Sequence, residues 1–437
     1  MRLSAQTFAK HRAQLMAKMS PGSIAIIPAA GAKPRSRDTN YRYRPDSDFY
    51  YLSGFEEPDA LLILAPGNPK GEFIVFCRPR DKQKEIWEGI MAGPEGVLAQ
   101  FGADAAFSIH QADQHIPELM DGRAKIYTQL GQCDDWDKQV MTWLRAVRAK
   151  ARSGACAPEV IADINAELHE LRLIKGEEEQ LAMAASCELA AQAHVRAMQY
   201  CQAGRYEYQL EAEILHGFAM SGAMSAAYNT IVGGGKNACI LHYINNDQPL
   251  KEGDLVLIDA GCELDYYAAD ITRTFPVNGR FSAPQKALYE LVLKAQEAAF
   301  AVIKPGTLWN EPHDVSVRVL TEGLVELGLL SGDVDELVSS GAYKAFYMHR
   351  VGHWLGMDVH DVGAYKIDGQ WRPLMAGMAM TVEPGLYISP DDMSVDEKWR
   401  GIGIRIEDDV IVTAEGYRVL TDGVPKTVED IERLMAG

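Results

Sequence analysis

The chain has 437 residues, of which 47% are hydrophobic and 24% are charged, a composition typical of a folded globular protein and unlike that of a disordered one. Acidic residues number 61 against 43 basic ones, and the formal net charge of −18 argues against binding to nucleic acid, which needs a basic surface. A chain of this length exceeds what one hydrophobic core usually serves, so two domains of unequal size are expected.

The cysteine pattern and the apolar runs bear on the compartment. Seven cysteines are scattered along the chain without a C-x-x-C spacing, which is a reduced, intracellular pattern. The first residues lack the apolar stretch of a secretion signal, and no later run approaches the roughly 18 apolar residues of a membrane span. We therefore expect a cytoplasmic protein that does not engage a membrane.

The N-terminal part alternates helical and extended patterns. An amphipathic helix is predicted over residues 7–19 and an apolar strand over 23–29, separated by Ser20-Pro21-Gly22. Further strands are predicted at 49–53, 60–64, 73–76 and 124–129, and a further helix around 135–150. These elements predict an α/β domain over residues 1–170.

The C-terminal part begins with a long Ala-, Leu- and Glu-rich helical pattern and then mixes strands with helices. Helices are predicted at 177–201, 206–221, 283–303 and 313–329. Strands are predicted at 229–232, 255–260, 269–277, 379–383 and 403–412. This mixture predicts an α+β domain over residues 171–437.

Five residues of the C-terminal domain form the most informative feature of the chain. They are Asp259, Asp270, His353, Glu383 and Glu407. The segments that hold them read as buried strands and tight turns, where an unpaired carboxylate would cost roughly several kcal/mol. A positive partner is therefore expected, and a pair of metal ions is the natural candidate.

The two aspartates lie 11 positions apart across a loop that contains Gly261. A hairpin centred between Leu264 and Asp265 would place Asp259 directly opposite Asp270, with Cβ atoms about 5 Å apart. Like charges this close repel unless a cation lies between them. Taken singly, either aspartate could equally well serve only to accept backbone hydrogen bonds.

The histidines favour the same conclusion. His353 lies in a glycine-flanked stretch together with His349 and His360, so that three of the eleven histidines of the chain fall within 12 positions. One isolated histidine is commonly a structural residue, whereas such a cluster favours a site.

The two glutamates lie at strand ends. Glu383 closes an apolar strand and is followed at once by Pro384-Gly385, a turn that directs its side chain out of the ladder. Strand alternation puts Arg405 and Glu407 on one face, so these two can also be interpreted as an ion pair within the strand.

Four carboxylates and one imidazole form an oxygen-rich ligand set. This set favours Mn²⁺, with Zn²⁺, Co²⁺ or Fe²⁺ as alternatives. The carboxylates would balance the charge of two divalent ions. Two ions about 3.5–4 Å apart can bridge a water, lower its pKa toward neutrality and hold a tetrahedral oxyanion, which is the chemistry of metal-assisted hydrolysis.

Several motifs resemble those of the aminopeptidase P family of pita-bread metallopeptidases. They are LHYINN, DLVLIDAG, AADITRTFPV, HRVGHWLGMDVHDVG, TVEPGLY and GIGIRIEDDV, and the N-terminal stretch YRYRPDSDFYYLSGFEEPDALLIL extends the resemblance over nearly the whole chain. The resemblance implies a C-terminal pita-bread metallopeptidase domain preceded by a smaller α/β domain. It also implies release of the N-terminal residue from peptides with proline in second position, by attack of a metal-bridging hydroxide.

The resemblance implies a role for each of the five residues. Asp259 would bind one ion, and His353 with Glu383 would bind the other. Asp270 and Glu407 would bridge both ions. Glu383 would in addition shuttle a proton.

The resemblance also implies residues that contact the substrate. His242 and His360 would position it and stabilise the tetrahedral intermediate. A proline pocket would be lined by His349, Tyr387 and Arg405, with Val359 adding an apolar wall. In a homotetramer or homodimer, Asp38 and Trp87 would approach a neighbouring active site.

Three alternatives were weighed against this interpretation. A prolidase would use the same five ligands on Xaa-Pro dipeptides only, but the closeness of the GIGIRIEDDV and HWLGMDVHDVG stretches favours the aminopeptidase. Methionine aminopeptidases lack the large N-terminal domain. A non-catalytic pita-bread protein that binds a peptide or partner would be expected to have lost ligands, and here all five are present.

Overall fold

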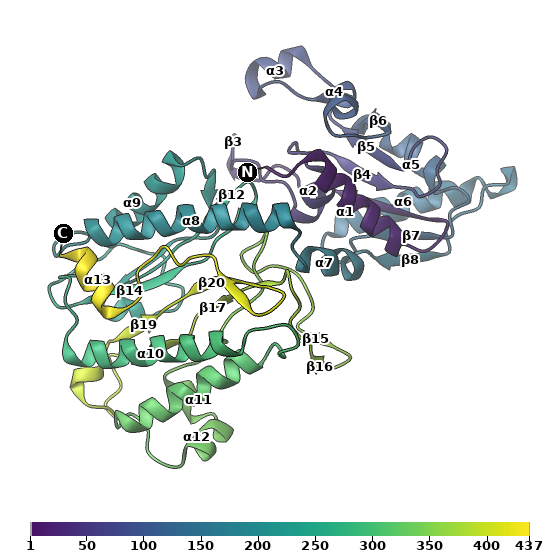
Figure 1. The fold of residues 1–437 in the computed structure, drawn as a ribbon. Coiled ribbons are helices and arrows are strands. Elements are labelled where there is room, and N and C mark those ends of the chain that lie inside the picture. Colours follow the sequence, from purple (N-terminus) through teal and green to yellow (C-terminus); the bar gives the residue numbers. More distant parts are fainter. Residues whose placement is uncertain (1, 437) are drawn as a thin grey trace. The chain divides into compact units, whose positions relative to one another are not determined.

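The computed structural model describes residues 2–436, which fall into two compact units. Residues 3–172 form the N-terminal unit, and residues 173–436 together with Arg2 form the C-terminal unit. Figure 1 shows both, with the chain coloured from purple at the N-terminus to yellow at the C-terminus.

The N-terminal unit is built on a six-stranded mixed sheet with the strand order β6-β5-β4-β1-β7-β8. Its strands are β1 (Ser23–Pro28), β4 (Leu61–Leu64), β5 (Phe73–Cys77), β6 (Ala105–Ser108), β7 (Lys125–Thr128) and β8 (Val160–Asp163), and a separate short hairpin is formed by β2 (Pro34–Ser36) and β3 (Thr39–Asn40). Strand β4 runs antiparallel to β1 and β5, whereas β7 is parallel to β1 and β8, and β6 to β5. Its helices are α1 (Ala5–Lys18), α2 (Ser47–Ser53), α3 (Lys82–Glu88), α4 (Gly93–Gln100), α5 (Ala112–Met120), α6 (Asp134–Ala149) and α7 (Asn165–Leu173).

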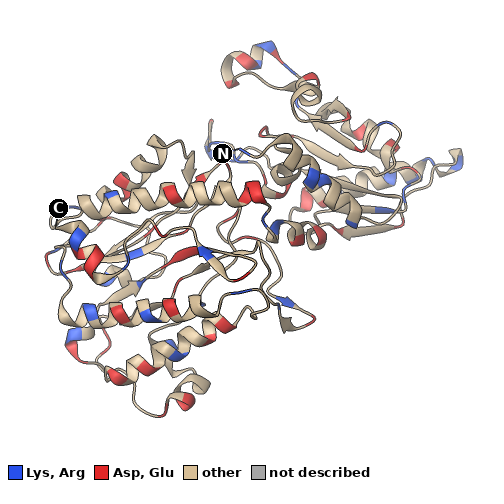
Figure 2. Cartoon of the chain, in the orientation of Figure 1, with Lys and Arg blue, Asp and Glu red and all other residues tan. Residues whose placement is uncertain are grey.

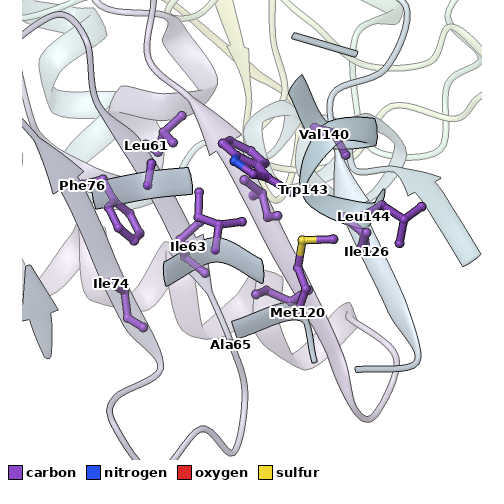
Figure 3. Packing of buried hydrophobic residues seen from close by; sticks show 14 of the residues in the cluster. Leu61, Ile63, Ala65, Ile74, Phe76, Met120, Ile126, Val140, Trp143 and Leu144 are labelled. Atoms are coloured by element: carbon purple, nitrogen blue, oxygen red, sulfur yellow. The ribbon is translucent and has the colours of Figure 1, made fainter. Parts of the chain in front are cut away.

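Helices α5 and α6 bury apolar faces against this sheet. In α6 the buried residues Val140, Trp143, Leu144 and Val147 follow the i, i+3, i+4, i+7 spacing of one helix face. Figure 3 shows Val140, Trp143 and Leu144 facing side chains of the strands, among them Ile126. The hydrophobic periodicity of the sequence therefore decides which face of the helix packs on the sheet.

The strand predicted at 49–53 is wrong, because these residues belong to helix α2. The Asp46 side chain caps the helix by accepting a hydrogen bond from the Phe49 backbone N–H at 3.0 Å, and Gly54 ends it with a positive φ of 65°. Every residue of α2 is buried, so the run carries no alternation of polar and apolar positions that would separate a helix from a strand.

The C-terminal unit combines helices with several small sheets. Its helices are α8 (Glu177–Tyr200), α9 (Glu207–Met220), α10 (Ala283–Val302), α11 (Glu311–Glu326), α12 (Val334–Ser340) and α13 (Val428–Met435). Its strands are β9 (Ser225–Ala226), β10 (Ile231–Gly234), β11 (Leu255–Asp259), β12 (Cys262–Leu264), β13 (Tyr267–Ala268), β14 (Thr272–Pro276), β15 (Lys366–Ile367), β16 (Gln370–Trp371), β17 (Ala379–Val382), β18 (Gly385–Tyr387), β19 (Gly403–Arg405), β20 (Asp408–Val412) and β21 (Tyr417–Val419).

Two long helices of the C-terminal unit flank the strands. Figure 1 shows α8 on one side of β14, β17, β19 and β20, and α10 on the other side, with α11 packed against α10. The sheets β10-β11-β14 and β17-β20-β21 form the layer between these helices. The predicted α+β class is confirmed.

The surface of these helices carries charges of both signs. Figure 2 shows Asp and Glu interspersed with Lys and Arg along α10 and α11, whereas the charged residues of α8 are mainly Glu. Among the described residues, no helix combines the length and apolar character that crossing a bilayer requires.

Candidate metal centre and substrate cavity

A cavity of about 1000 Å³ lies in the C-terminal unit. All five predicted metal ligands line it, together with the other predicted site residues His242, His349, Val359, His360 and Arg405. Tyr387 is buried one layer behind this wall, where it contacts two of the lining residues.

The register of the hairpin differs from the predicted one. Strands β11 and β14 pair with Asp259 opposite Thr272, not opposite Asp270. The turn is formed by Asp265 and Tyr266, both with positive φ, so its centre lies one residue later than expected. Because the resulting offset is two residues, Asp270 stays on the same face of the hairpin as Asp259.

Tyr228, which the sequence analysis did not identify, joins these two aspartates. Its hydroxyl lies 2.6 Å from Asp259 Oδ1 and 2.5 Å from Asp270 Oδ1. The residue is in the segment between β9 and β10, and β10 pairs antiparallel with β11 so that Ile231 lies opposite Asp259. Asp259 and Asp270 are therefore brought together by the Tyr228 hydroxyl as well as by the strand register.

Glu407 lies between two strands. The predicted continuous strand over 403–412 is interrupted, because β19 ends at Arg405 and β20 begins at Asp408. Thr272 holds Glu407 twice: its carbonyl accepts from the Glu407 backbone N–H at 3.0 Å, and its hydroxyl donates to Glu407 Oε2 at 2.6 Å. Asp270, His353 and Glu407 each offer a ligand atom, and these atoms lie within 4.8 Å of one another.

The backbone around His353 fixes its ring. The His353 N–H donates to the Thr381 hydroxyl at 3.1 Å, and its carbonyl accepts from the Thr381 N–H at 3.0 Å. Nδ1 lies 2.9 Å from the Trp354 carbonyl oxygen, which can only accept, so Nδ1 carries a proton. Nε2 is thereby left to face Asp270 Oδ2 at 3.4 Å and Glu383 Oε1 at 3.7 Å.

The approach of His353 to β17 depends on Gly352. A Cβ atom at this position would lie 2.0 Å from the Thr381 carbonyl oxygen. The glycine next to the histidine is therefore required by close backbone packing.

Three of the cavity carboxylates, Asp270, Glu383 and Glu407, have raised pKa values. Burial and the neighbouring Asp259 raise the pKa of Asp270, and burial with Asp270 and Glu383 raises the pKa of Glu407 well above its usual value. Burial likewise raises the pKa of Glu383 to about 7. Their ionised forms need positive charge from outside the fold.

His353 behaves in the opposite way. Burial lowers its pKa, but the hydrogen bond with Asp270 and the charges of Glu383 and Asp270 outweigh burial and raise the pKa to about 9. A divalent ion at Nε2 would take the place of that proton.

A hydrogen-bonded relay forms the wall beside Glu383. Arg405 donates through Nη1 to the Tyr387 hydroxyl at 3.0 Å, and this hydroxyl lies 2.8 Å from His349 Nε2. Burial and the positive charge of Arg405 lower the pKa of His349 to about 3, so the ring is neutral and Nε2 accepts from Tyr387. His349 Nδ1 donates to the Arg350 carbonyl at 2.8 Å. With both nitrogens engaged, His349 offers the cavity an uncharged ring.

The remaining cavity walls come from distant segments. His360 lies beside His353 with ring centroids 4.3 Å apart, and burial together with the charge of His353 lowers the pKa of His360. His242 is contributed by the segment that connects β10 to β11. The aromatic residues Trp309, Tyr365 and Trp371 also line the cavity and were not predicted.

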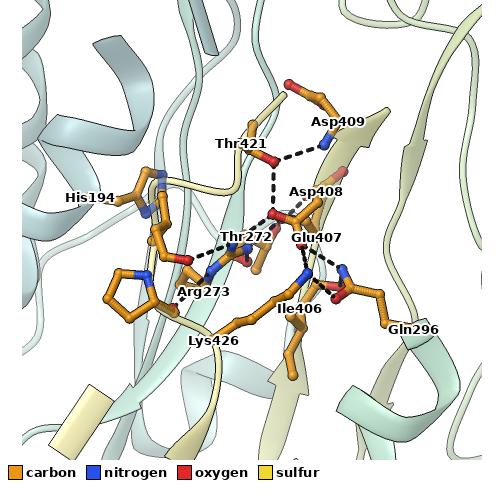
Figure 4. Close-up of polar contacts among 12 residues, drawn as sticks. His194, Thr272, Arg273, Gln296, Ile406, Glu407, Asp408, Asp409, Thr421 and Lys426 are labelled. Carbon is orange, nitrogen blue, oxygen red and sulfur yellow. Dashed lines mark hydrogen bonds and ion pairs between the residues drawn. The ribbon is translucent and has the colours of Figure 1, made fainter. Parts of the chain in front are cut away.

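Behind the cavity, a buried polar network supports the ligands (Figure 4). Arg273, which is fully buried, donates to the Glu407 carbonyl and to Asp408 Oδ1, both at 2.6 Å. Asp408 also accepts from Lys426 at 2.8 Å and from Thr421 at 2.7 Å. Burial alone would raise the pKa of Asp408, but the charges of Arg273 and Lys426 outweigh it and lower that pKa.

A second buried ion pair fixes the segment that carries His360. Lys175 Nζ lies 2.9 Å from Asp361 Oδ2, and both side chains are 1% exposed. Asp361 follows His360 directly and donates its backbone N–H to the Trp354 carbonyl. A Cβ on Gly356 would lie 2.1 Å from Asp361 Oδ2, so this glycine makes room for the pair.

Asp38 and Trp87 belong to the N-terminal unit, where both side chains are exposed, Trp87 to 88%. Their approach to a neighbouring active site stays a prediction.

Comparisons with known proteins agree with this fold and this cavity. The sequence model of metallopeptidase family M24 matches residues 182–414, and that of the aminopeptidase P N-terminal domain matches residues 8–127. A Xaa-Pro aminopeptidase of Escherichia coli is 45% identical over 99% of this chain and 98% of its own length. The structure of Pseudomonas aeruginosa aminopeptidase PepP is 56% identical, with a TM-score of 0.99 over 100% of this chain and 98% of that one. A variant of Escherichia coli aminopeptidase P in complex with substrate is 44% identical, with a TM-score of 0.97 over 100% and 99%.

The fold and the acidic cavity are those of a metallopeptidase, and the chain belongs to metallopeptidase family M24. Two bacterial relatives that match over 99% of the chain are Xaa-Pro aminopeptidases, so the predicted aminopeptidase P family, with its α/β domain ahead of a pita-bread domain, is confirmed.

Proposed function

We propose that the chain is a metal-dependent exopeptidase that releases the N-terminal residue from peptides with proline in second position. The observation that carries the proposal is the convergence of four carboxylates and His353 on one cavity, in a chain 45% identical over its length to a Xaa-Pro aminopeptidase. The substrate complex of the Escherichia coli enzyme supports a peptide as the occupant of the cavity. The same comparisons do not favour the prolidase alternative.

The residues present fit divalent cations. Buried carboxylates whose pKa values are raised by burial and by one another gain from a positive charge that lets them ionise. We assign Asp259 to one ion, His353 and Glu383 to the other, and Asp270 and Glu407 to both. Oxygen ligands of this number favour Mn²⁺, with Zn²⁺ or Co²⁺ as alternatives. When bound, a pair of such ions lowers the pKa of a water molecule and polarises a carbonyl group.

Glu383 is the residue we assign to proton transfer. Its carboxyl group lines the cavity beside His353, with Oε1 3.7 Å from His353 Nε2, where it can reach a water molecule held in the cavity. It would take a proton from the attacking water and deliver it to the proline nitrogen of the leaving peptide. His242 and His360, on the walls of the same cavity, would hold the oxygen of the tetrahedral intermediate.

The wall formed by His349, Arg405 and Val359 suits a proline ring. A Xaa-Pro bond has no N–H to donate, so its recognition depends on shape and apolar contact. The neutral ring of His349, held by Tyr387, and the side chain of Val359 supply such a surface. Arg405 is fixed by Asp259 at 2.5 Å and by Thr272 at 3.0 Å, so this side of the pocket is rigid.

The deciding experiment compares an Arg-Pro-Pro peptide with a Xaa-Pro dipeptide on metal-stripped protein, with and without added Mn²⁺. Release of the first residue from the longer peptide only when metal is present supports the proposal. Cleavage of the dipeptide alone would reassign the chain to the prolidases. No cleavage with Mn²⁺, Zn²⁺ or Co²⁺ would revive a peptide-binding role.

We further propose a cytoplasmic homotetramer or homodimer in which Asp38 and Trp87 approach a neighbouring active site. The 88% exposure of Trp87, unusual for so large an apolar side chain, supports this assembly. Sedimentation of the full chain at several concentrations tests it, and a monomer at all of them would contradict it.

A further inference from the structure

Glu207 is a fully buried carboxylate on the first residue of α9, and it does not line the cavity. Its Oε1 accepts from the Gly234 backbone N–H at 2.7 Å and from the Asn237 side-chain amide at 2.9 Å. Its Oε2 accepts from the Tyr243 hydroxyl at 2.8 Å and from the Gln248 N–H at 2.9 Å. All four donors belong to residues 234–248, which we call the connecting segment because it leads from β10 toward β11.

The connecting segment carries part of the cavity wall. Leu241, His242 and Ile244 line the cavity, whereas Tyr243, between them, is buried and bonded to Glu207. Apart from the short 3₁₀ helix at Gly235–Cys239 and the last residue of β10, the described structure has no helix or strand in this segment. Its conformation therefore depends on side-chain hydrogen bonds to its backbone and to Tyr243.

Glu207 is suited to hold the segment because every partner is a donor. A carboxylate is an acceptor at both oxygens, and hydrogen bonds to an ionised group are stronger than those between neutral groups. A glutamine would turn an NH₂ group toward two of the four donors. A Cβ at Gly234 would lie 2.7 Å from Leu250 Cδ2, so the glycine leaves room for the Leu250 side chain next to the hydrogen bond between Gly234 and Glu207.

The backbone of Glu207 also contacts the connecting segment. Its N–H donates to the Gln248 carbonyl at 3.0 Å, so Glu207 and Gln248 are joined by two hydrogen bonds. Glu207 thus contacts the connecting segment at three places: at its beginning through Gly234, next to His242 through Tyr243, and at its end through Gln248. His242 in turn lines the same cavity as His349 and His360.

We propose that Glu207 is a positioning residue for His242: its carboxylate holds the connecting segment so that His242 faces the substrate in the cavity. The role of His242 rests on the proposed function, whereas the hold on the segment does not. Glu207 touches neither the substrate cavity nor a proposed metal ligand, so its effect on the reaction passes through the connecting segment that carries His242.

The kinetic test uses Glu207→Gln in the full-length, Mn²⁺-loaded protein. Because small misplacements of a reacting group are costly, kcat for the Arg-Pro-Pro peptide falls about 10- to 100-fold, with KM and metal content little changed. Added to His242→Ala, the same substitution lowers kcat no further. Effects that multiply in the double variant would overturn the proposal, because Glu207 would then act independently of His242.

The matched control is Glu213→Gln on the same helix. Glu213 pairs with Arg196 of α8 at 2.6 Å, away from the connecting segment, and its replacement leaves kcat unchanged. If Glu207→Gln does not fold, Tyr243→Phe removes only one of the four donors, and its kcat then falls a few-fold, again only while His242 is present. An unchanged kcat in Tyr243→Phe would contradict the proposal.

A second readout does not depend on activity. Hydrogen exchange of the backbone amides of residues 234–248 becomes faster in Glu207→Gln, whereas exchange in β17 and β20 stays as in the unsubstituted protein. Unchanged exchange in the segment, or an equal acceleration throughout the C-terminal unit, would overturn the proposal. If the unsubstituted protein does not hydrolyse the peptide, the proposed function fails, and this exchange measurement still decides whether Glu207 holds the segment.

Discussion

Glu407 and Asp408 are neighbours in the chain and are both buried, yet they lie in opposite electrostatic surroundings. Glu407 faces the cavity with Asp270 and Glu383, and burial with these like charges raises its pKa. Asp408 faces the other side of the layer, where Arg273 and Lys426 outweigh burial and lower its pKa (Figure 4). Two consecutive residues thus differ in sign: the surroundings of Glu407 disfavour its ionised form, whereas those of Asp408 favour it.

This difference distinguishes two sides of the strand layer. The support side holds the network of Arg273, Asp408 and Lys426, and the cavity side holds the proposed metal ligands. On the support side, the Asp408 carboxylate has two cationic partners within the chain, Arg273 and Lys426, so its charge is compensated without bound ions. On the cavity side, carboxylates outnumber cationic side chains, so their ionisation depends on ions from solution. The two sides should therefore respond oppositely to substitution, to metal and to pH.

The largest effect is expected from Glu383→Ala, on the cavity side. Loss of the group assigned to proton transfer lowers kcat about 10³-fold or more, within the range for general acid–base residues. The melting temperature changes little, because a side chain whose ionised form the fold opposes is removed. Steady-state kinetics and calorimetry check this, and substantial remaining hydrolysis would remove Glu383 from the proton-transfer role.

The sharpest comparison of the two sides pairs Asp408→Asn with Asp270→Asn. Asp408→Asn leaves Arg273 buried without its charge partner and lowers the free energy of unfolding by about 3 kcal/mol in metal-free protein. Asp270→Asn relieves the repulsion from Asp259 but also removes a partner of His353, so it destabilises the metal-free protein less than Asp408→Asn does. Denaturant unfolding in a chelator distinguishes them, and equal destabilisation would mean that the two sides do not differ.

The same pair of variants differs in its response to Mn²⁺. An ion at 100 times its dissociation constant adds about 2.7 kcal/mol of stability. Asp408→Asn keeps this gain, whereas Asp270→Asn loses most of it and binds less metal. Elemental analysis checks the stoichiometry, and an unchanged metal content in Asp270→Asn would contradict its assignment as a ligand.

The pH dependence of the metal-free protein should have opposite signs on the two sides. The pKa of Glu383 is about 7 in the fold against an ordinary 4.5, so the folded state binds more protons and stability falls as the pH rises through this window. Between pH 5 and 6.5 this loss amounts to about 2 kcal/mol. Asp408 has a lowered pKa, so its contribution is present above pH 3.8 and is lost as the pH falls below it.

Unfolding of metal-free Glu383→Gln over the same range provides the control. Its free energy of unfolding should fall less steeply between pH 5 and 6.5 than that of the unsubstituted protein. Identical pH dependence of the two proteins would show that a titratable group other than Glu383 is responsible for the loss of stability between pH 5 and 6.5.

The smallest effect is expected from Val359→Ala, on the apolar wall. Two lost methyl groups weaken contact with the proline ring, so KM rises about five-fold while kcat is kept. A peptide with alanine in second position should respond less. An equal rise in KM for both peptides would show that Val359 does not contact the proline ring.

The sequence was sufficient for the fold class, the family and the identity of the clustered residues, because motifs such as DLVLIDAG and TVEPGLY combine strand patterns with carboxylates at strand ends. It was not sufficient for residues 49–53, whose uniform burial removes the periodicity that distinguishes α2 from a strand. The hairpin register was wrong because the turn required positive φ at Asp265 and Tyr266, and neither is a glycine.

Other residues of the site could not be recognised from the sequence pattern around them. Tyr228 joins Asp259 to Asp270 from an irregular segment, where spacing carries no information about neighbours. Trp309 lines the cavity from a segment whose contacts are distant in the sequence: its backbone N–H donates to the Arg372 carbonyl at 3.0 Å. The family resemblance placed Tyr387 in the proline pocket, whereas its side chain supports His349 and Arg405 from behind.

The ion pair between Lys175 and Asp361 sets where the C-terminal unit can be cut from the rest of the chain. Lys175 lies before the start of α8, and its backbone N–H also donates to the Gly377 carbonyl at 2.8 Å. A fragment that began at Glu177, the first residue of α8, would lack Lys175 and so lose its ion pair with the buried Asp361, the residue after His360. An expressed fragment that is to retain an ordered active site must therefore include the two residues of irregular chain that precede the helix.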